Sequence, residues 1–404
     1  MSTQTDYDVV VVGGGPAGAT AATDLARKGR HVLLLDRAGR IKPCGGAVPP
    51  RLMEEFDVPQ DLLVAKAASA QIVSPTHRRV DMPIEGGYVG MVDRDEFDEW
   101  LRCRAALAGA DRATGRFKDL DRDEDGTAVV VYETKDEETV RVRTRQVIGA
   151  DGARSTVARV AIPGAKRPPC VFAYHEIVES PEQETELFAG DRCDIHYRGQ
   201  LSPDFYSWIF PHGKTTSVGT GSANKGFSLK GAVAELREIS GLKDVKTIRK
   251  EGAPIPLKPL KRWDNGKDVL LAGDAAGVVA PASGEGIYYA MCCGRMVADA
   301  VEDCLATGNA KALATARKRF MKLHGQVFWI LGIMQKFWYA NDARRERFTT
   351  ICGDKDVQRL TWEAYMHKRL VRANPLAHIR IFLKDSAHLL GLVPPGPGAP
   401  KQSR

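Results

Sequence analysis

Three glycines near the start of the chain have a spacing that suits the binding of a dinucleotide. They are Gly13, Gly15 and Gly18, in the sequence Gly-Gly-Gly-Pro-Ala-Gly. The first permits a sharp turn, the second lets backbone approach a pyrophosphate, and the third allows close packing of a helix on a strand. Asp36 lies 21 residues after Gly15, where a carboxylate can bind ribose hydroxyls. An acid here favours FAD or NAD over NADP, because it would repel a 2′-phosphate.

The residues around these glycines predict the elements that must position them. Residues 7–12 are a β-branched apolar run, typical of a buried parallel strand. An alanine-rich helix is expected to follow as far as Lys28 and to end at Gly29. Residues 32–35 form a second apolar strand that ends at Asp36. Glycines alone would indicate only a tight turn, but the strand, helix and acid together predict a βαβ unit that binds a dinucleotide.

Two further aspartates follow short apolar strands later in the chain. Asp151 follows residues 146–150, and Asp274 follows residues 269–272 and Gly273. The carboxyl ends of strands are where an open α/β sheet binds its ligands. Either aspartate alone could equally be an ordinary helix N-cap.

Taken together, the three motifs resemble the FAD fingerprints of glutathione-reductase-like enzymes related to aromatic hydroxylases. The resemblance implies that Asp274 binds the FAD ribitol, and that Asp151 and Gly152 lie near both FAD and NADPH. Arg94, in Asp-Arg-x-x-Phe-Asp, would contact FAD, and Gly286 and Ile287 would approach the flavin ring. The other cofactor contacts it implies are Ala17, Arg37, Cys44, Gly45, Ala47 and Gly273.

Two more motifs narrow the resemblance to the geranylgeranyl reductase family. They are Lys42-Pro43-Cys44-Gly45-Gly46 and Tyr206-Ser207-Trp208-Ile209-Phe210-Pro211. The resemblance implies that Tyr206, Trp208, Phe210 and Pro211 line an isoprenoid pocket and that the Cys-Gly-Gly loop sits over the flavin. Three stretches resemble the chlorophyll and bacteriochlorophyll branch more than the archaeal lipid branch: Cys44–Pro49, Val357-Gln358-x-x-Thr361 and Asn374-Pro375-Leu376.

The implied reaction is reduction of three isolated double bonds of a geranylgeranyl chain to give phytyl. The substrate would be the diphosphate or the bacteriochlorophyllide ester, with NADPH or reduced ferredoxin as electron donor. We expect hydride transfer from reduced flavin N5 to be coupled to protonation, because these alkenes cannot stabilise a carbanion. The alternatives are an archaeal-type polyprenyl lipid reductase, a flavin monooxygenase and a non-catalytic prenyl-binding escort. The intact FAD motifs argue against the escort.

Cys44 and Tyr206 are the candidate catalytic residues. A cysteine thiol that is protonated at neutral pH can donate a proton. Cys44 is equally well interpreted as a small loop residue beside the flavin. Residues 206, 208 and 210 alternate along an expected strand, so their aromatic faces would lie on one side and could stabilise a developing cation. Without the resemblance, a core aromatic stripe would be the preferred interpretation.

The composition is that of a globular protein with a basic C-terminal part. The chain has 404 residues and a net charge of +7, and residues 311–404 hold 18 Lys+Arg against 6 Asp+Glu. No nucleic-acid motif accompanies this charge. The aromatic stretch 320–339 predicts either peripheral contact with an anionic membrane or a helix packed on the FAD domain. Bacteriochlorophyll synthase would then be an expected partner.

The eight cysteines have no metal-ligand spacing and are expected to be reduced, with no metal bound. A polar N-terminus and the lack of a long apolar run predict a cytoplasmic protein without a signal peptide or transmembrane helix. The expected fold class is α/β, with a Rossmann-type FAD domain, an antiparallel substrate domain and a helical C-terminal region. The expected boundaries are 1–70, 94–170 and 262–305 for the first, 71–93 and 171–261 for the second, 306–392 for the third, and 393–404 for a disordered tail.

Overall fold

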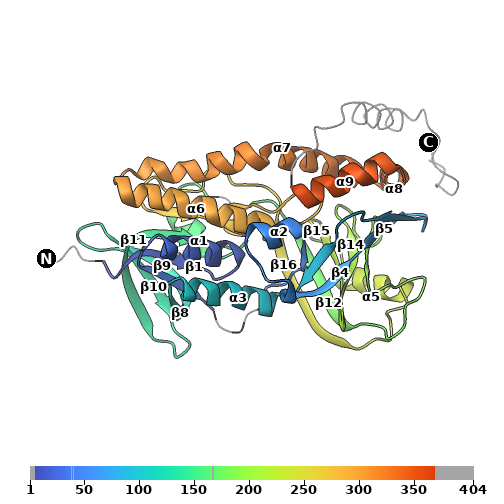
Figure 1. Ribbon diagram of the computed structural model, residues 1–404, viewed down its shortest axis with the longest axis horizontal. Coiled ribbons are helices and arrows are strands. Elements are labelled where there is room, and N and C mark those ends of the chain that lie inside the picture. The colour runs from blue at the N-terminus through green and yellow to red at the C-terminus, as the bar shows by residue number, and fades with distance from the viewer. Residues whose placement is uncertain (1–4, 38, 40, 166–167, 369–404) are drawn as a thin grey trace. The chain divides into compact units, whose positions relative to one another are not determined.

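The structure, a computed structural model, describes residues 5–37, 39, 41–165 and 168–368 (Figure 1). It divides into two compact units, each built from three stretches of the chain. The first unit comprises residues 1–42, 94–170 and 254–328, and the second comprises residues 43–93, 171–253 and 329–404. The prediction for the C-terminal tail lies outside the described residues, as does the Asn374-Pro375-Leu376 stretch.

The first unit is an α/β layer around a seven-stranded sheet of order β8-β2-β1-β11-β10-β9, with β17 paired to β11. The β2, β1, β11 and β17 strands are parallel to their neighbours in this group, and β9–β11 continue the sheet antiparallel. Its strands are β1 (Tyr7–Val12), β2 (Val32–Asp36), β8 (Asp111–Thr114), β9 (Arg116–Arg122), β10 (Ala128–Glu133), β11 (Thr139–Gly149) and β17 (Val269–Leu271).

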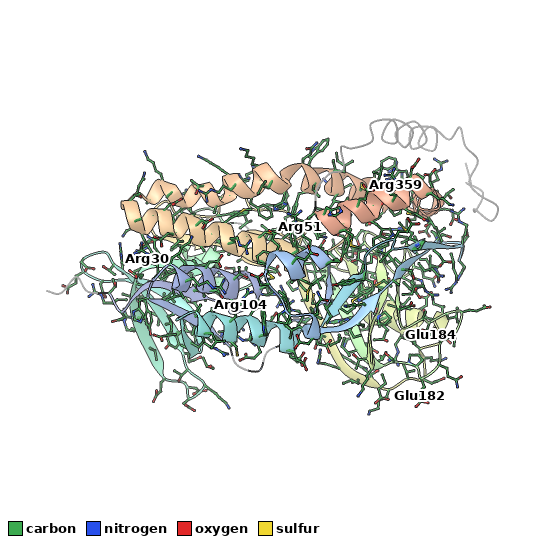
Figure 2. All side chains as sticks on the ribbon, viewed as in Figure 1. Arg30, Arg51, Arg104, Glu182, Glu184 and Arg359 are labelled. Atoms are coloured by element: carbon green, nitrogen blue, oxygen red, sulfur yellow. The ribbon has the colours of Figure 1, made fainter. Side chains whose placement is uncertain are left out.

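Helices cover this sheet, and α1 packs closely beside α6 (Figure 1). Close packing is permitted because Gly294 of α6 meets the backbone of Ala17, where a Cβ would lie 2.3 Å from the Ala17 oxygen. Arg30, after α1, reinforces the contact by donating to Glu302 of α6 at 2.7 and 2.6 Å (Figure 2). The helices are α1 (Pro16–Arg27), α3 (Arg94–Leu107), α4 (Thr156–Ala161), η2 (Gly273–Ala276), α6 (Ile287–Thr307) and η3 (Ala310–Leu313). The long helix α7 (Ala314–Trp338) contributes residues to both units.

The second unit contains a seven-stranded sheet of order β16-β12-β15-β14-β13-β5-β6 and a small sheet of order β3-β7-β4. The large sheet is antiparallel except where β13 runs parallel to β5. Its strands are β5 (Ser69–Val73), β6 (Arg79–Pro83), β12 (Cys170–Glu179), β13 (Arg192–His196), β14 (Ser207–His212), β15 (Thr215–Ser222) and β16 (Thr247–Pro256). The small sheet contains β3 (Ala47–Val48), β4 (Leu63–Ala67) and β7 (Val89–Val92).

The helices of the second unit are α2 (Pro50–Glu55), η1 (Gln60–Leu62), α5 (Leu229–Ile239), α8 (Asp342–Ile351) and α9 (Lys355–His367). The α/β class and the antiparallel second sheet agree with the sequence-based expectation. The division of the chain differs from the expected boundaries in several respects. Residues 43–70 join the second unit, because β3 and β4 both pair with β7. Residues 329–368 also belong to that unit rather than to a separate helical region.

Candidate functional site

The three acidic motifs meet at one edge of the first unit's sheet. β1 lies between β2 and β11, where Val12 pairs with both Leu35 and Gly149. Gly149 in turn pairs with Leu271 of β17. Because these strands are parallel, their carboxyl ends lie side by side, at the edge where open α/β sheets bind ligands. The motif residues that this register brings to the edge are Gly13, Asp36, Asp151, Gly273 and Asp274.

The glycine-rich turn has the geometry that its spacing predicts. Gly13 has a φ of +108°, and a Cβ there would lie 2.3 Å from the carbonyl oxygen of Ala150. A Cβ on Gly18 would lie 1.9 Å from the oxygen of Gly13, so strand and helix approach too closely for any side chain. At Gly15, by contrast, a Cβ would meet no atom within 4 Å. The helix α1 then starts at Pro16 with no side-chain cap, which leaves its N–H groups free for a phosphate.

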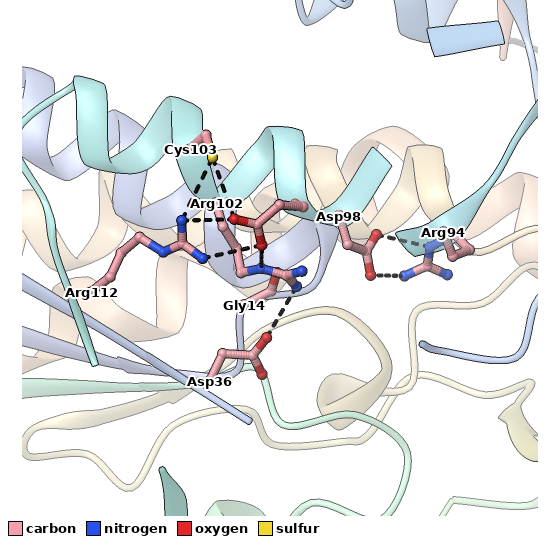
Figure 3. Close-up of polar contacts among 8 residues, drawn as sticks. Gly14, Asp36, Arg94, Asp98, Arg102, Cys103 and Arg112 are labelled. Atoms are coloured by element: carbon pink, nitrogen blue, oxygen red, sulfur yellow. Dashed lines mark hydrogen bonds and ion pairs between the residues drawn. The ribbon is translucent and has the colours of Figure 1, made fainter. Parts of the chain in front are cut away.

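Asp36 at the end of β2 is paired with Arg102 of α3 (Figure 3). The Nη1 atom of Arg102 donates to Asp36 at 3.1 Å and to the carbonyl oxygen of Gly14 at 3.4 Å. Its Nε atom donates to Glu99 at 2.8 Å, so the guanidinium is held on two sides. Sequence reasoning missed Arg102, because it lies 66 residues from Asp36 and belongs to no motif. Arg37, the next predicted contact, is exposed.

Arg94 is the first residue of α3, and its side chain is only 4% exposed. Its Nε and Nη2 atoms donate to the two oxygens of Asp98 at 2.8 and 2.7 Å (Figure 3). A bidentate, buried pair of this kind fixes the guanidinium in one orientation. Whether it faces FAD stays a prediction.

Asp151 hydrogen-bonds to the first turn of α4, although the N-cap residue of that helix is Ser155. Its carboxylate accepts from the backbone N–H groups of Thr156 at 2.6 Å and Val157 at 3.1 Å, and from the Ser155 hydroxyl. Burial raises the pKa of Asp151, and the hydrogen bonds from Ser155 and the α4 backbone oppose that shift. Gly152 beside it has a φ of +86°, and a Cβ there would meet no atom within 4 Å.

Asp274 lies in η2, and its carboxylate is paired with the ammonium group of Lys42. A Cβ on Gly286 would lie 3.9 Å from the Asp274 carboxylate, so the N-cap of α6 approaches the same carboxyl group. Gly273, with a φ of +63°, packs against Ala17, and Ile287 is buried as the first residue of α6. Two helix N-termini, those of α1 and α6, therefore lie among the predicted FAD residues of the first unit. No side chain caps either of them.

The aromatic motif forms a continuous row of rings in the second unit. The rings of Tyr206 and Trp208 lie 5.9 Å apart between centroids, and those of Trp208 and Phe210 lie 6.2 Å apart. Tyr206 precedes β14 directly, whereas Trp208, Phe210 and Pro211 belong to the strand. The prediction of three aromatic faces on one side agrees with this ladder.

The row depends on a glycine that sequence reasoning did not single out. On β15, Gly219 pairs with Trp208 on one side and with His175 of β12 on the other. A Cβ on Gly219 would lie 2.2 Å from Cζ2 of Trp208 and 2.6 Å from Cβ of His175. The indole therefore lies over the glycine. The signal that could have revealed it is the Gly219-Thr-Gly221 alternation in an otherwise β-branched run.

A buried polar chain begins at the nitrogen of Trp208. Its Nε1 donates to the hydroxyl oxygen of Ser217 at 3.1 Å, and the same hydroxyl lies 3.0 Å from Nδ1 of His175. The Nε2 atom of His175 lies 3.2 Å from the carboxylate of Glu251. Indole only donates and carboxylate only accepts, so a neutral His175 with its proton on Nε2 satisfies every partner. This chain fixes the plane of the indole ring.

The Cys-Gly-Gly loop packs on the same aromatic strand. A Cβ on Gly45 would lie 3.1 Å from Cδ2 of Phe210 and 3.8 Å from Nε1 of Trp208. The Sγ atom of Cys44 accepts from the backbone N–H of Gly46 at 3.4 Å. Ala47 then starts β3 by pairing with Met91 of β7. Two motifs separated by some 160 residues are thus in contact, through Gly45 of the loop and the rings of Phe210 and Trp208.

Within residues 5–37, 39, 41–165 and 168–368, no group of three or more His, Cys, Asp or Glu side chains could hold a metal ion. In the same part of the chain, no helix is both long and apolar enough to cross a membrane. All eight cysteines lie in the described part of the chain, and none of them forms a disulfide bond.

Comparison with known proteins agrees with this geometry. Residues 6–319 match the model of the FAD binding domain family. Over 389 residues, the chain is 56% identical to geranylgeranyl diphosphate reductase of Rhodobacter capsulatus, which covers 96% of this chain and 99% of the relative. The chain belongs to the geranylgeranyl reductase family. It is also 37% identical to the chloroplastic geranylgeranyl diphosphate reductase of Oryza sativa, over 95% of this chain and 86% of that one.

This geranylgeranyl reductase family member shares its fold with solved structures of low sequence identity. A geranylgeranyl bacteriochlorophyll reductase-like protein from Thermoplasma acidophilum superposes with a TM-score of 0.80 at 22% identity, over 94% of this chain and 99% of that one. A flavin-dependent brominase superposes with a TM-score of 0.74 at 17% identity, over 94% and 99% of the two chains. The FAD-domain and family resemblances inferred from the motifs are thereby confirmed.

Proposed function

We propose that this protein is an FAD-dependent reductase that converts a geranylgeranyl chain to phytyl by reducing three isolated double bonds. The substrate is the diphosphate or the bacteriochlorophyllide ester, and NADPH is the electron donor, with reduced ferredoxin as the alternative. The 56% identity to a geranylgeranyl diphosphate reductase over nearly the whole chain supports the reaction class. The likeness to plant relatives that carry the same name supports a place in the chlorophyll branch rather than the archaeal one.

The observation that carries the proposal is the contact between the Cys44 loop and the aromatic row. An isolated alkene needs a proton as well as a hydride, in a dry site where aromatic faces can stabilise a developing cation. Tyr206 and Trp208 are buried, and Phe210 packs against Gly45, next to the only thiol in the loop. The arrangement thus combines the aromatic faces and the acid that the reaction requires.

The chain's own residues hold the cofactor and the proton. The first unit fits FAD, since Gly15 leaves room for a pyrophosphate and two uncapped helix N-termini can bind negative charge. FAD, when bound and reduced by the electron donor, would supply the hydride. Cys44 donates the proton, while the residues of the aromatic row, with Pro211, exclude water and bind the prenyl chain.

The direct test is anaerobic incubation of the purified protein with NADPH and geranylgeranyl-bacteriochlorophyllide, followed by mass spectrometry of the product. Successive gains of two mass units, up to three times, are expected. The same run with geranylgeranyl diphosphate compares the two substrates, and reduced ferredoxin replaces NADPH in a further run. Reduction of archaeal diether lipid alone would favour the archaeal-type reductase. Oxygen-dependent hydroxylation would favour a monooxygenase, and prenyl binding without flavin would favour an escort.

Replacing Cys44 tests its role as proton donor. Cys44→Ser and Cys44→Ala should both retain FAD and slow each reduction step by about 100-fold or more, the usual contribution of a general acid. Unchanged rates for all three steps would remove Cys44 from the mechanism. Cys103→Ser is the matched control, because Cys103 is exposed on α3 of the first unit.

We also propose that α7 makes peripheral contact with an anionic membrane. On this helix Trp329 and Ile333 are 66% and 47% exposed, Lys336 continues the same face, and the sequence of α7 contains no acidic residue. A basic face with an exposed tryptophan suits a lipid interface. Such contact would also suit an exchange of prenyl substrate with a membrane-bound bacteriochlorophyll synthase.

Flotation with vesicles tests this contact. The protein should bind vesicles of phosphatidylglycerol in a salt-sensitive manner and should not bind phosphatidylcholine. The double variant Trp329→Ser with Ile333→Ser should lose binding. Leu107→Ser is the control, since Leu107 is 90% exposed on a different helix. Equal binding by the double variant and the control would contradict the proposal.

A further inference from the structure

His212, the residue that follows Pro211, connects two parts of the second unit that the proposed function needs. Its side chain is 5% exposed. Nδ1 lies 2.8 Å from the carboxylate of Asp93, and Nε2 lies 3.1 Å from the carbonyl oxygen of Gly45. The ring also packs on the loop, because a Cβ on Gly46 would lie 2.5 Å from Cε1 of His212.

Both partners of the imidazole ring can only accept hydrogen bonds. A carboxylate and a backbone carbonyl have no proton to offer, so each ring nitrogen must carry one for both bonds to form. His212 is therefore an imidazolium that donates to Asp93 and to Gly45. The charged group that contacts the ring is Asp93, directly after β7. The loop that packs on the ring carries the Cys44 thiol, and the residue paired with His212 on β15, Thr215, is uncharged.

The bond to Gly45 sets the orientation of one peptide group. In a trans peptide the C=O and the next N–H point in opposite directions, so fixing the Gly45 oxygen also fixes the N–H of Gly46. That N–H donates to Sγ of Cys44 at 3.4 Å. Gly46 has a φ of +73°, and a Cβ there would also lie 2.5 Å from the oxygen of Val92, so the loop has little room to rearrange. The orientation of the Cys44 thiol thus depends on His212.

We propose that His212 is a positioning residue: its imidazolium clamps the Gly45–Gly46 peptide group and thereby holds the sulfur of Cys44 in its donating geometry. The clamp requires Asp93 as the counter-ion. The effect on turnover rests on the proposed function, whereas the effects on the thiol and on the ring protons do not.

The first test measures the thiol itself, without any prenyl substrate. Alkylation by iodoacetamide is followed for Cys44 by peptide mass spectrometry in wild type, His212→Phe, His212→Asn and Asp93→Asn. Loss of the clamp should change the Cys44 rate about threefold or more in His212→Phe and His212→Asn, the scale of one hydrogen bond. His77→Asn is the control, because His77 is exposed in the same unit and asparagine tolerates its φ of +64°. A Cys44 rate in His212→Phe equal to that of the control would overturn the proposal.

The second test needs no substitution at His212. In ¹⁵N-correlated spectra of wild-type holoenzyme at neutral pH, both ring nitrogens of His212 should carry protons. Asp93→Asn should leave one proton, on Nε2, because the amide can donate to Nδ1. A ring of His212 that carries only one proton in the wild type would overturn the claim that His212 is an imidazolium.

The third test is steady-state turnover. His212→Asn should lower kcat about tenfold, the loss expected for a hydrogen bond from a charged donor, with a KM for the prenyl substrate within about twofold of wild type. A rise in KM alone would assign His212 to substrate binding instead. If the wild type has no prenyl reductase activity, the proposed function fails, and the alkylation and spectroscopic results still decide the clamp.

Discussion

The sheet edge of the first unit and the aromatic face of the second are built by different means. The sheet edge is built mostly from backbone. Gly13, Gly15 and Gly18, with the uncapped N-termini of α1 and α6, form a surface that we call the cradle. The aromatic face is built mostly from side chains. The Trp208 indole lies over Gly219, and hydrogen bonds run from Trp208 to Glu251. A pyrophosphate offers charge that N–H groups bind in any sequence context, whereas an apolar chain offers only shape. If the aromatic face binds the prenyl chain as we propose, this difference accounts for one site being made of short spaced motifs and the other of contacts across strands.

The largest expected effect breaks the cradle at its tightest point. In Gly18→Ala the new methyl group would lie 1.9 Å from the oxygen of Gly13, and neither backbone can move without separating α1 from β1. We expect loss of about 3 kcal/mol or more of unfolding free energy, at or above the usual cost of overpacking, and loss of bound flavin. Urea unfolding and the visible spectrum measure both.

Gly15→Ala is the matched control in the same turn. Its methyl group meets no protein atom within 4 Å, so the free energy of unfolding without cofactor should stay within about 1 kcal/mol of wild type. FAD affinity should still fall sharply, since the methyl group points where the pyrophosphate binds. If both variants bind FAD as the wild type does, the cradle is not the cofactor site.

The next effect separates the two regions. Gly219→Ala should push Trp208 out of the aromatic row, because the added methyl group would lie 2.2 Å from Cζ2 of the indole. Prenyl turnover should fall about 100-fold, the loss expected when reacting groups are misplaced by about 1 Å, while FAD content stays full. Gly226→Ala is the control, because Gly226 lies in a turn of the same unit with no atom closer than 3.6 Å. Joint loss of flavin and turnover in Gly219→Ala would show that the two regions are not separable.

The contrast also explains what the sequence could predict. The Gly13, Gly15 and Gly18 spacing depends on contacts within one βαβ unit, so it can be read from adjacent residues. Arg102 beside Asp36 could not be predicted, because a helix 66 residues away supplies it. His175 and His212 belong to no motif that the sequence singles out. Their roles depend on strand register, which pairs His175 with Gly219 and brings His212 to the loop. The aspartate of the second motif, Asp151, could be placed at a strand end but not distinguished from a helix cap.

A smaller effect tests the polar chain behind Trp208. Burial alone would raise the pKa of Glu251, but the hydrogen bond from His175 and the charge of Arg249 hold it below its ordinary value. A lowered carboxyl pKa stabilises the fold above the ordinary value of 4.5, and this contribution is lost as the pH falls through the folded-state pKa. Glu251→Gln should therefore cost about 1–2 kcal/mol near neutral pH and little in acid.

Chemical unfolding of wild type and Glu251→Gln at a series of pH values measures this difference. Turnover should fall about threefold to tenfold. Trp208 keeps its hydrogen bond to Ser217, but His175, which holds Ser217, loses the carboxylate that fixes its ring. Glu184→Gln is the control, since Glu184 lies on an exposed turn of the same unit (Figure 2). A constant difference in stability between wild type and Glu251→Gln across the acid range would contradict a stabilising role for the ionised Glu251 carboxylate.

The smallest effect concerns the ionic support of the cradle. A hydrogen bond from Arg112, with others from Arg102 and Cys103, lowers the pKa of Glu99 to about 2. Its stabilising contribution is present above the ordinary value of 4.5 and is lost as the pH falls from there through about 2. The Glu99 side chain is 46% exposed, so solvent screening limits the contribution to less than about 1 kcal/mol. Glu99→Gln should weaken FAD binding by no more than about threefold, because Arg102 keeps its contacts with Asp36 and Gly14. A loss of FAD affinity as large as that of Gly15→Ala would show that side chains, and not only backbone, build the cradle.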